Sequence, residues 1–433
     1  MKEIFREYGI RGVYPSEINE SFFEKFGRAF VVWQKAKKVY VGRDDRVSSP
    51  ALAKALMLGL REQGADVIDL GLISTPMAYL ASRNGHVLMV TASHNPAKYN
   101  GIKVVLKGPR LVGGKTLEPV RKLLNRPFAK AKKGRHVKKT ILSSYLSLIL
   151  KHAQHVPKLN VVLDAGNGMA GLTIPKIVKE LPLNVTYLDF EIDGRYPHHV
   201  PNPALPENVK DCAEMVKHKR ANLGVSFDGD MDRAMFIDEH GRVIPADVIL
   251  ALFATHTLKQ HPKRAVVYDL RASRAVKQAI QAHGGIPVES KVGHTNIVNK
   301  MKRFGAILGG ELSGHYYFKE FFGVESADLA FIKVLNIMGK TGLPLSALVN
   351  PYLQYYHSGE LNFSVADKTR TIAKIANEFK GKQSRLDGLT VQYPDAWFNI
   401  RLSNTEPLVR LVIEANTQER MHFLKEKLMK YLH

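Results

Sequence analysis

The sequence is short of cysteine, of long apolar runs and of acidic residues. Its single cysteine, Cys212, excludes an internal disulfide framework and is typical of a reducing cytoplasm. No apolar run reaches the roughly 18 residues that a membrane-spanning helix needs, so we expect no membrane partner. Residues 1–8 carry charges where a secretion signal needs an apolar stretch. These features together predict a cytoplasmic protein.

The acidic residues are outnumbered, since 40 Asp and Glu face 63 Lys and Arg, and the formal net charge is +23. Such a charge is compatible with binding nucleic acid or with attracting anionic substrates. The basic residues are dispersed, and the densest run, residues 130–139, has no aromatic residue on which a base could stack. We expect that run to be a solvated linker and the protein to bind no nucleic acid.

The length of 433 residues predicts three or four domains, and three stretches of the chain repeat one layout. Each has a β-rich run, a segment with the 3.6-residue period of a helix, and a second β-rich run. The stretches are 39–44, 50–63 and 65–70; 161–165, 172–180 and 184–188; and 265–269, 273–283 and 286–289. This pattern is typical of α/β domains built on mostly parallel sheets.

The C-terminal part differs from these repeats. A helix pattern at 370–379 precedes β-rich runs at 397–402 and 408–414, and another helix pattern follows at 418–432. This order predicts a smaller α+β domain. We place the domains at 1–140, 141–243, 244–352 and 353–433.

Four polar loops follow apolar, strand-like runs, at residues 91–96, 228–233, 311–315 and 401–407. In α/β sheets, ligands bind outside the carboxyl ends of the strands. Because the first three loops follow equivalent strands of the three repeats, we expect them to face one cleft.

Ser93 in the first loop is a candidate nucleophile, because a loop at a strand end exposes its hydroxyl. The plainer interpretation is a turn serine, since Asn95-Pro96 marks turns well. Lys103 is close enough in sequence to return toward the serine, and beside basic groups its pKa would be lowered so that it could shuttle protons.

Asp228, Asp230 and Asp232 alternate along the second loop, so their carboxylates can converge on one ion, for which Mg²⁺ is the natural candidate. An EF-hand loop is the main alternative, with Glu239 at its last position. Against it, Arg233 stands where the sharp EF-hand turn needs glycine, and no helix precedes the loop.

The third and fourth loops offer sugar and phosphate contacts. Glu311, Ser313 and His315 lie in a glycine-rich turn whose carboxylate and hydroxyl could hold sugar hydroxyls, or could satisfy only the turn itself. The fourth cluster could bind a phosphate dianion, or could be a hairpin with exposed arginines. Its members are Arg401, Ser403, Asn404, Thr405 and Arg410.

Taken together and in this order, the four loops resemble those of the α-D-phosphohexomutase family, and most closely bacterial phosphomannomutase/phosphoglucomutase. The segments 5–12 and 291–295 also look like segments of this family. The resemblance covers the whole chain. It implies three similar mixed-sheet α/β domains and a smaller C-terminal α+β domain around one cleft, carrying in turn the phosphoserine, the metal, the sugar and the phosphate.

The resemblance also implies roles for individual residues. Ser93 would carry the phosphoryl group and, with the three aspartates, bind Mg²⁺; Lys103 and Arg11 would assist proton transfer, with His294 a further candidate. Glu311 and Ser313 would hold the sugar 3- and 4-hydroxyls, and the fourth cluster would bind the non-reacting phosphate. Further substrate contacts would come from Tyr8, Arg233, Arg271, Lys291 and His315.

Three places depart from the family pattern. Gly9 stands where aspartate is usual, Arg271 where lysine is usual, and residues 324–328 where an acidic, glycine-rich stretch is usual. Contacts near these positions are expected to differ from those of the family.

The predicted activity is a reversible phosphoryl shift between C1 and C6 of mannose or glucose phosphate, through a phosphoserine and a hexose 1,6-bisphosphate that also serves as activator. The enzyme would be an isomerase and a monomer or weak dimer. Alternatives are a phosphoglucosamine mutase, against which Leu312 argues because glutamine is usual there, and a metal-dependent phosphatase with a serine nucleophile. A basic nucleic-acid-binding protein would leave the three aspartates unexplained.

Overall fold

The structure is a computed structural model that describes residues 4–6, 9–402 and 408–432. Its internal contacts divide the chain into two compact units. The first unit contains residues 1–244 and 313–346, and the second contains residues 245–312 and 347–433. The domain boundaries near 140, 243 and 352 remain predictions.

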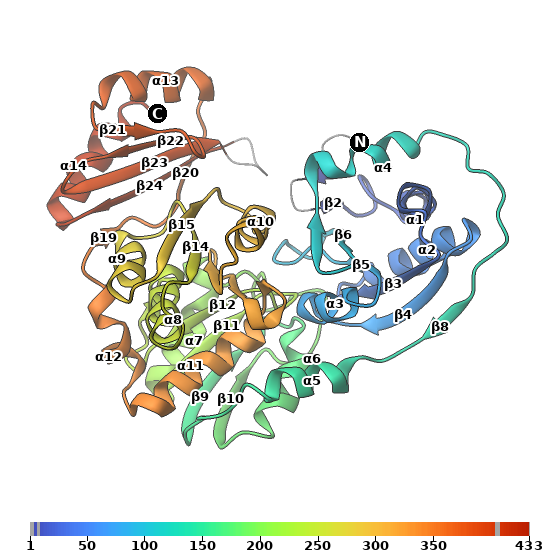
Figure 1. The fold of residues 1–433 in the computed structure, drawn as a ribbon, viewed down its shortest axis with the longest axis horizontal. Helices are drawn as coiled ribbons and strands as arrows, with labels where there is room; N and C mark the ends of the chain where they lie inside the picture. Colours follow the sequence, from blue (N-terminus) through green and yellow to red (C-terminus); the bar gives the residue numbers. More distant parts are fainter. Residues whose placement is uncertain (1–3, 7–8, 403–407, 433) are drawn as a thin grey trace. The chain divides into compact units, whose positions relative to one another are not determined.

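A mixed eight-stranded sheet organises the N-terminal part of the first unit (Figure 1). Its order is β1-β2-β6-β5-β3-β4-β8, with β7 paired to β6. β4 and β5 flank β3 in parallel, whereas β6 runs antiparallel to β5 and β2. The strands are β1 (Phe5–Arg6), β2 (Gly9–Val13), β3 (Lys38–Arg43), β4 (Asp66–Leu72), β5 (His86–Val90), β6 (Tyr99–Leu106), β7 (Arg110–Val112) and β8 (His136–Lys138).

The helices of this part are α1 (Glu20–Gln34), α2 (Ser49–Glu62), α3 (Thr75–Ser82) and α4 (Glu118–Leu123). Asn19 caps α1 by accepting the N–H of Phe22 at 3.0 Å, which satisfies a donor that the first helical turn leaves free. Two glycines let α1 and α2 pack backbone against backbone, since a Cβ on Gly59 would lie 1.9 Å from the carbonyl oxygen of Glu24. The phenylalanines of α1 fill the core beside this contact.

A second mixed sheet of the first unit has the order β10-β9-β11-β12-β13. β10 and β11 flank β9 in parallel, and β12 is antiparallel to β11. Every residue of β11 and β12 is buried, so the loop that joins them also lies inside the protein. The elements of this part are β9 (Leu159–Asp164), β10 (Leu183–Leu188), β11 (Leu223–Phe227), β12 (Ala234–Ile237), β13 (Val243–Ile244), α5 (Leu142–Leu150), α6 (Ala170–Val178) and α7 (Lys210–Lys219). Residues 313–346 of the same unit carry β17 (Tyr316–Phe318) and β18 (Val324–Glu325), which pair with each other and are not strands of this sheet, and α11 (Ala327–Thr341).

Parallel strands in the order β15-β14-β16 begin the second unit. Leu250 of α8 lies so close to β16 that a Cβ on Gly310 would be 2.7 Å from it, and the leucine side chain would have to shift. The elements are α8 (Ala246–Gln260), β14 (Ala265–Asp269), α9 (Arg274–Ala282), β15 (Ile286–Ser290), α10 (His294–Phe304) and β16 (Leu308–Gly310); α12 (Leu345–Val349) lies where the chain re-enters this unit.

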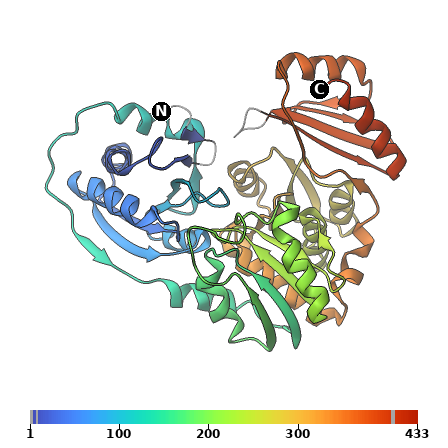
Figure 2. The same cartoon turned by 180° about the vertical axis from the view of Figure 1, so that it is seen from behind.

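An antiparallel sheet of order β19-β24-β23-β22-β21, with β20 paired to β24, forms the C-terminal part of the second unit. Two helices cover it (Figure 2) and share one core with its strands, which contains Ile375, Leu424 and Phe398. The elements are β19 (Tyr356–His357), β20 (Leu361–Phe363), α13 (Lys368–Glu378), β21 (Lys382–Ser384), β22 (Leu389–Gln392), β23 (Ala396–Leu402), β24 (Val409–Ala415) and α14 (Gln418–Met429).

The predicted class of fold is confirmed, because three α/β arrangements share the order of parallel strands second-first-third and are followed by a smaller α+β part. A single cleft between the domains stays a prediction. The prediction of a plain linker at 130–139 is wrong in part. Residues 136–138 form β8, which pairs in parallel with β4 while its side chains remain exposed.

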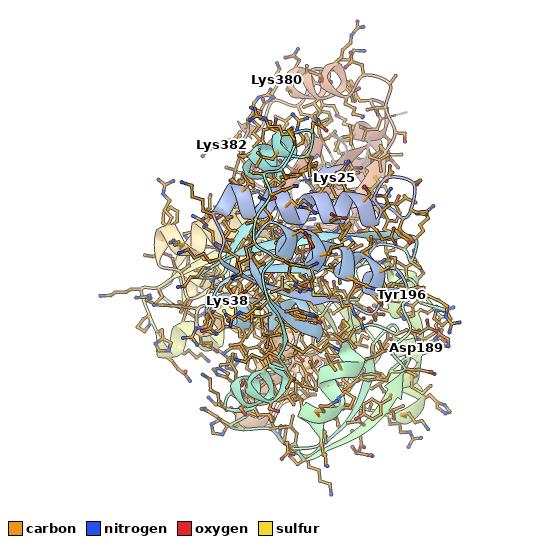
Figure 3. The ribbon with its side chains drawn as sticks, turned by 90° about the vertical axis from the view of Figure 1, so that its right-hand side faces the viewer. Lys25, Lys38, Asp189, Tyr196, Lys380 and Lys382 are labelled. Carbon is orange, nitrogen blue, oxygen red and sulfur yellow. The ribbon has the colours of Figure 1, made fainter. Side chains whose placement is uncertain are left out.

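Within the described residues, no helix combines the length and the apolar composition that crossing a bilayer requires. Exposed basic side chains are spread over different elements. Lys25 on α1, Lys38 on β3 and Lys382 on β21, all labelled in Figure 3, are examples. The net charge of +23 therefore has no single basic run as its source.

Candidate active site

Ser93 lies in the loop between β5 and β6, where the apolar run of β5 ends. Its φ is +53°, in the left-handed region that residues other than glycine rarely adopt, and the residue is 5% exposed. The Ser93 N–H donates to Thr91 Oγ1 at 2.9 Å. Its hydroxyl lies 3.1 Å from Asp228 Oδ2 and 3.3 Å from His94 Nδ1. The strained turn thus directs the hydroxyl at the aspartate loop.

The three aspartates lie on the tight, buried loop between β11 and β12. Met231 adopts φ +68°, which turns the chain within the loop. Asp228 Oδ1 accepts the N–H groups of Asp232 and Arg233 at 3.0 and 3.1 Å, so this carboxylate also closes the loop. One oxygen from each of the three carboxylates lies within 4.8 Å of the others. Their predicted convergence is therefore present in the structure.

Lys103 reaches the aspartates from β6. Its Nζ lies 2.8 Å from Asp230 Oδ2, donates to Asp232 Oδ2 and lies 3.2 Å from Thr75 Oγ1. The prediction of a lowered pKa is wrong. Burial would lower the pKa of this ammonium, but the charges of Asp230 and Asp232 outweigh burial and raise it. Lys103 therefore keeps its proton and provides a fixed positive charge.

The aspartate cluster can hold a divalent cation. Asp230 Oδ1 is buried and has no hydrogen-bond partner among the described residues. Burial and the charges of Asp232 and Asp230 raise the pKa of Asp228 well above its ordinary range. Burial acts in the same direction on Asp232, but Lys103 and His315 hold the pKa of Asp232 well below that range. The close approach of the three carboxylates thus disfavours their full ionisation, and a hard divalent ion would relieve this repulsion.

Three predicted substrate-binding residues gather beside Asp232. His315 Nε2 lies 3.3 Å from Asp232 Oδ1 and 3.3 Å from Arg233 Nε. Ser313 Oγ lies 2.8 Å from the other ring nitrogen of His315. An isolated backbone bridge between Arg233 and His315 holds these two segments together.

Arg11 lies on β2, and His94 follows Ser93 in its loop. Burial lowers the pKa of Arg11 to about 10, although Asp230 lies close enough to act in the opposite direction. Burial and the charge of Arg233 lower the pKa of His94 well below its ordinary range, so its imidazole is neutral. Near them, Gly9 departs from the family pattern. Its φ is +107° and a Cβ would lie 2.4 Å from the carbonyl oxygen of Ile102, so only glycine fits this position.

In the second unit, three arginines converge on Glu360. Arg401 Nη2 and Arg271 Nη1 donate to Glu360 Oε2 at 2.7 and 3.0 Å, and Arg410 Nη1 donates to Oε1 at 2.7 Å. Arg401 and Arg410 are direct neighbours across β23 and β24, and the carboxylate offsets their repulsion. Burial would raise the pKa of Glu360, but the three guanidinium groups lower it to about 2.

The other departures from the family pattern have structural roles. Arg271 is buried and also donates to Asp269 Oδ2 at 2.7 Å, so two carboxylates fix its guanidinium. Within 324–328, Asp328 is buried and accepts hydrogen bonds from Tyr145 Oη at 2.5 Å and from Thr173 Oγ1 at 2.9 Å. Asp328 therefore contributes to the interior of the first unit.

The remaining predicted residues of the second unit lie near the start of α10. Glu311 is buried, and its Oε1 accepts the N–H of Gly293 at 2.8 Å. His294, the first residue of α10, is 8% exposed, whereas Lys291 is exposed. The approach of His294 to Ser93 stays a prediction. Tyr8, Ser403, Asn404 and Thr405 lie outside the described residues.

Sequence reasoning missed Arg46, Thr75, His94 and Glu360. Arg46 and Thr75 follow β3 and β4, at the same edge of the sheet as Ser93. A search of every strand end in the first repeat would have found both. Glu360 lies in a Ser-Gly-Glu-Leu stretch that matches no functional motif, so only the fold identifies it.

Four domain families match the chain in order. They are described as Phosphoglucomutase/phosphomannomutase alpha/beta/alpha domains I, II and III, over residues 2–130, 142–241 and 245–356, and the Phosphoglucomutase/phosphomannomutase C-terminal domain, over residues 360–430.

Full-length relatives carry related names. A phosphomannomutase/phosphoglucomutase of Pseudomonas syringae is 36% identical to this chain, and the aligned region covers 96% of this chain and 92% of the relative. A phosphomannomutase of Methanocaldococcus jannaschii is also 36% identical, over 98% and 95% of the two chains. A crystal structure of a family protein from Burkholderia thailandensis superposes with a TM-score of 0.92 at 32% identity, covering 100% of this chain and 97% of that one. The chain therefore belongs to the phosphoglucomutase/phosphomannomutase family and is a phosphohexomutase, an enzyme of the isomerase class.

Proposed function

We propose that this enzyme moves a phosphoryl group reversibly between C1 and C6 of a hexose phosphate, with Ser93 as the group that carries it. The observation that supports this most is the 3.1 Å contact between Ser93 Oγ and Asp228 Oδ2, two residues 135 positions apart in the sequence. A hydroxyl beside buried carboxylates and a buried lysine suits phosphoryl transfer, because positioning and charge stabilisation supply most of its catalysis.

Mg²⁺ is the ion that we assign to the aspartate cluster, since it prefers oxygen ligands and leaves positions open for phosphate oxygens. Asp228, Asp230 and Asp232, with an oxygen of phosphorylated Ser93, would hold it. When bound, the ion would stabilise the negative charge of the transferring group. The hydrogen bonds of Asp228 to the N–H groups of its own loop keep that carboxylate in place for this role.

In the first half of the reaction, phosphorylated Ser93 gives its phosphoryl group to the free hydroxyl of the substrate. The bond from phosphorus to Ser93 Oγ breaks as the bond to the substrate oxygen forms, and the substrate proton passes to a base, for which His294 stays our candidate. The proton that the substrate hydroxyl loses balances the one that Ser93 Oγ takes up, and neutral His94 lies 3.3 Å from Ser93 Oγ. Lys103 and Arg11 hold their charges beside the transferring group.

The product of that step is a hexose 1,6-bisphosphate. It turns over in the site, and its other phosphoryl group returns to Ser93, so that the protein is restored and the phosphate has changed position. Added bisphosphate would also phosphorylate Ser93 directly and act as activator. Glu311 and Ser313 are proposed to hold the 3- and 4-hydroxyls in both orientations. Because these contacts do not involve the hydroxyl on C2, where glucose and mannose differ, we expect both glucose and mannose phosphates to be substrates.

The non-reacting phosphate would be bound by Arg401 and Arg410, with Ser403, Asn404 and Thr405 of the same loop. Their pairing with Glu360 supports this assignment, because it keeps both guanidinium groups together and oriented. We further propose a cytoplasmic enzyme, in agreement with its single, buried cysteine. We also propose that it works as a monomer or weak dimer.

A coupled mutase assay tests the proposal. Glucose 1-phosphate, mannose 1-phosphate and glucosamine 1-phosphate are supplied in turn, with Mg²⁺ or with a chelator, and the 6-phosphate is detected. We expect turnover of the first two that requires the metal ion. Preferred turnover of the amino sugar, or release of inorganic phosphate without isomerisation, would overturn the proposed substrate class or the reaction.

A further inference from the structure

Arg46 is a charged side chain that the mechanism above does not use, and yet it is wholly buried in the first unit, with 0% exposure. Burying a guanidinium group destabilises the folded protein unless all its N–H groups have acceptors. Each of its five donors has one. Nε pairs with Asp44 Oδ2 at 3.2 Å, and the other four N–H groups reach backbone carbonyl oxygens.

Three of the four carbonyl groups belong to the loop that carries Ser93, and the fourth belongs to Tyr99, the residue at which this loop joins β6. Nη2 donates to the oxygens of Ser93 and Asn95 at 2.7 and 2.6 Å, and Nη1 donates to those of Pro96 and Tyr99 at 2.8 and 2.9 Å. The loop leaves β5 and returns on β6, so one side chain ties both ends of it to the start of α2. A loop held at four carbonyl groups has little freedom to shift.

The carbonyl group of Ser93 is fixed from a second direction. A Cβ on Gly229, between two of the aspartates, would lie 2.8 Å from this oxygen, so the aspartate loop packs directly against it. Arg46 holds the same oxygen. The carbonyl position of a residue in the left-handed region sets the direction of its side chain. Arg46 therefore bears on the distance between Ser93 Oγ and Asp228.

The guanidinium is itself held in place. Asp44 Oδ1 accepts the N–H of Arg46 at 3.2 Å and the hydroxyl of Ser49, and Asn100 of β6 donates to Ser49 Oγ at 2.9 Å. On the other face, the ring of Tyr196 stacks over the guanidinium with 5.1 Å between Arg46 Cζ and the ring centroid. Tyr196, labelled in Figure 3, is 8% exposed and comes from the segment that follows β10.

From this geometry we propose that Arg46 is a positioning residue that holds Ser93 in its left-handed conformation, with the hydroxyl aimed at the aspartate cluster. The proposal rests on the proposed function, in which Ser93 carries the phosphoryl group. Arg46 touches no reacting atom and acts through the loop alone. It is a different role from that of Lys103, whose charge faces the cluster directly.

Arg46→Lys tests the proposal, because lysine keeps the charge but has three donors on one nitrogen and cannot span the four carbonyl groups. We expect the rate of Ser93 phosphorylation by hexose 1,6-bisphosphate, and kcat, to fall about 100-fold, as for a misplacement of about 1 Å, while KM for the phosphosugar stays nearly unchanged. Arg61→Lys is the matched control, since Arg61 donates to one carbonyl oxygen, that of Gly134, away from Ser93. It should retain wild-type rates.

Leu56→Ala, in the buried core of α2, controls for lost stability. It should lower the unfolding temperature. In assays well below that temperature, its kcat should equal that of the wild type. Tyr196→Leu removes the stacked ring and should lower the rate of Ser93 phosphorylation about tenfold. This variant tests the role of Arg46 if Arg46→Lys does not fold. A wild-type protein that is never phosphorylated at Ser93 would overturn the proposed function. Normal phosphorylation in wild type, Arg46→Lys and Tyr196→Leu alike would overturn only the role of Arg46.

Discussion

Replacing Lys103 by methionine should both destabilise the protein and strengthen its binding of Mg²⁺. Lys103 is 4% exposed and pairs with two aspartates that are themselves buried. Removing one partner of a buried ion pair typically costs about 3–5 kcal/mol, because the other charge is left buried without compensation. At about 2–4 °C per kcal/mol for a domain of roughly 150–250 residues, that loss lowers the unfolding temperature by roughly 6–20 °C. We expect this fall in the presence of a chelator.

Mg²⁺ should reverse much of this loss. Two unit charges about 4 Å apart interact by about 4 kcal/mol at an effective dielectric constant of about 20, so the lysine repels any cation held by the same carboxylates. Its removal should tighten Mg²⁺ binding at least about tenfold, which requires about 1.4 kcal/mol. Thermal unfolding across a Mg²⁺ titration measures this, since an ion that binds only the folded state raises its stability with concentration.

The control for this experiment is Lys107→Met, which removes an exposed lysine just beyond β6. It should behave as the wild type does at every Mg²⁺ concentration. Mutase activity of Lys103→Met should fall by about 10²-fold or more even when Mg²⁺ is saturating, because a preorganised charge at the transferring group is lost. Equal Mg²⁺ stabilisation of Lys103→Met and wild type would refute the placement of the ion beside this lysine.

Three further predictions follow from the same geometry. Asp228→Asn keeps an acceptor for the N–H groups of its loop but loses a charged ligand, so calorimetric titration should give Mg²⁺ binding at least about tenfold weaker; unchanged affinity would exclude Asp228 as a ligand. Glu360→Gln removes a negative charge from among three arginines, so KM for the phosphosugar should fall by about threefold or more, and an equal or higher KM would contradict this. Burial raises the pKa of Asp328 to about 6, so the folded protein holds a proton that the unfolded chain releases above about pH 4. The contribution of Asp328 to stability is thus greatest below pH 4 and falls by about 3 kcal/mol as the pH rises to 7; Asp328→Asn should remove this fall, and parallel unfolding profiles of the two proteins from pH 4 to 7 would count against it.

Periodicity in the sequence predicted the β-α-β cores of the three repeats and the main elements of the C-terminal part, because these elements bury regular faces. The segment 273–283 appears as α9 from Arg274 to Ala282, and the run 223–227 is β11. The short strand β8 was not predicted, because its side chains are all exposed and only its backbone pairs with β4. Such a strand leaves no pattern of apolar residues to recognise.

Predictions about the site succeeded where several residues of one chemical kind lie together in the sequence. The alternating aspartates converge because a single tight loop carries them. The pKa of Lys103 was predicted in the wrong direction, because the sequence does not show that β6 brings its ammonium onto two carboxylates. The role of Arg46 could not be predicted from the sequence either, since its acceptors are backbone carbonyl groups, which have no sequence signature.

The most direct test of the account is to locate the phosphoryl group. Intact-mass analysis and peptide mapping of the active protein should find one phosphoryl group on Ser93, and excess hexose monophosphate with Mg²⁺ should remove it. Ser93→Ala should carry none and lose nearly all mutase activity. A fully active protein without phosphate on Ser93, or a Ser93→Ala variant with substantial turnover, would contradict the account.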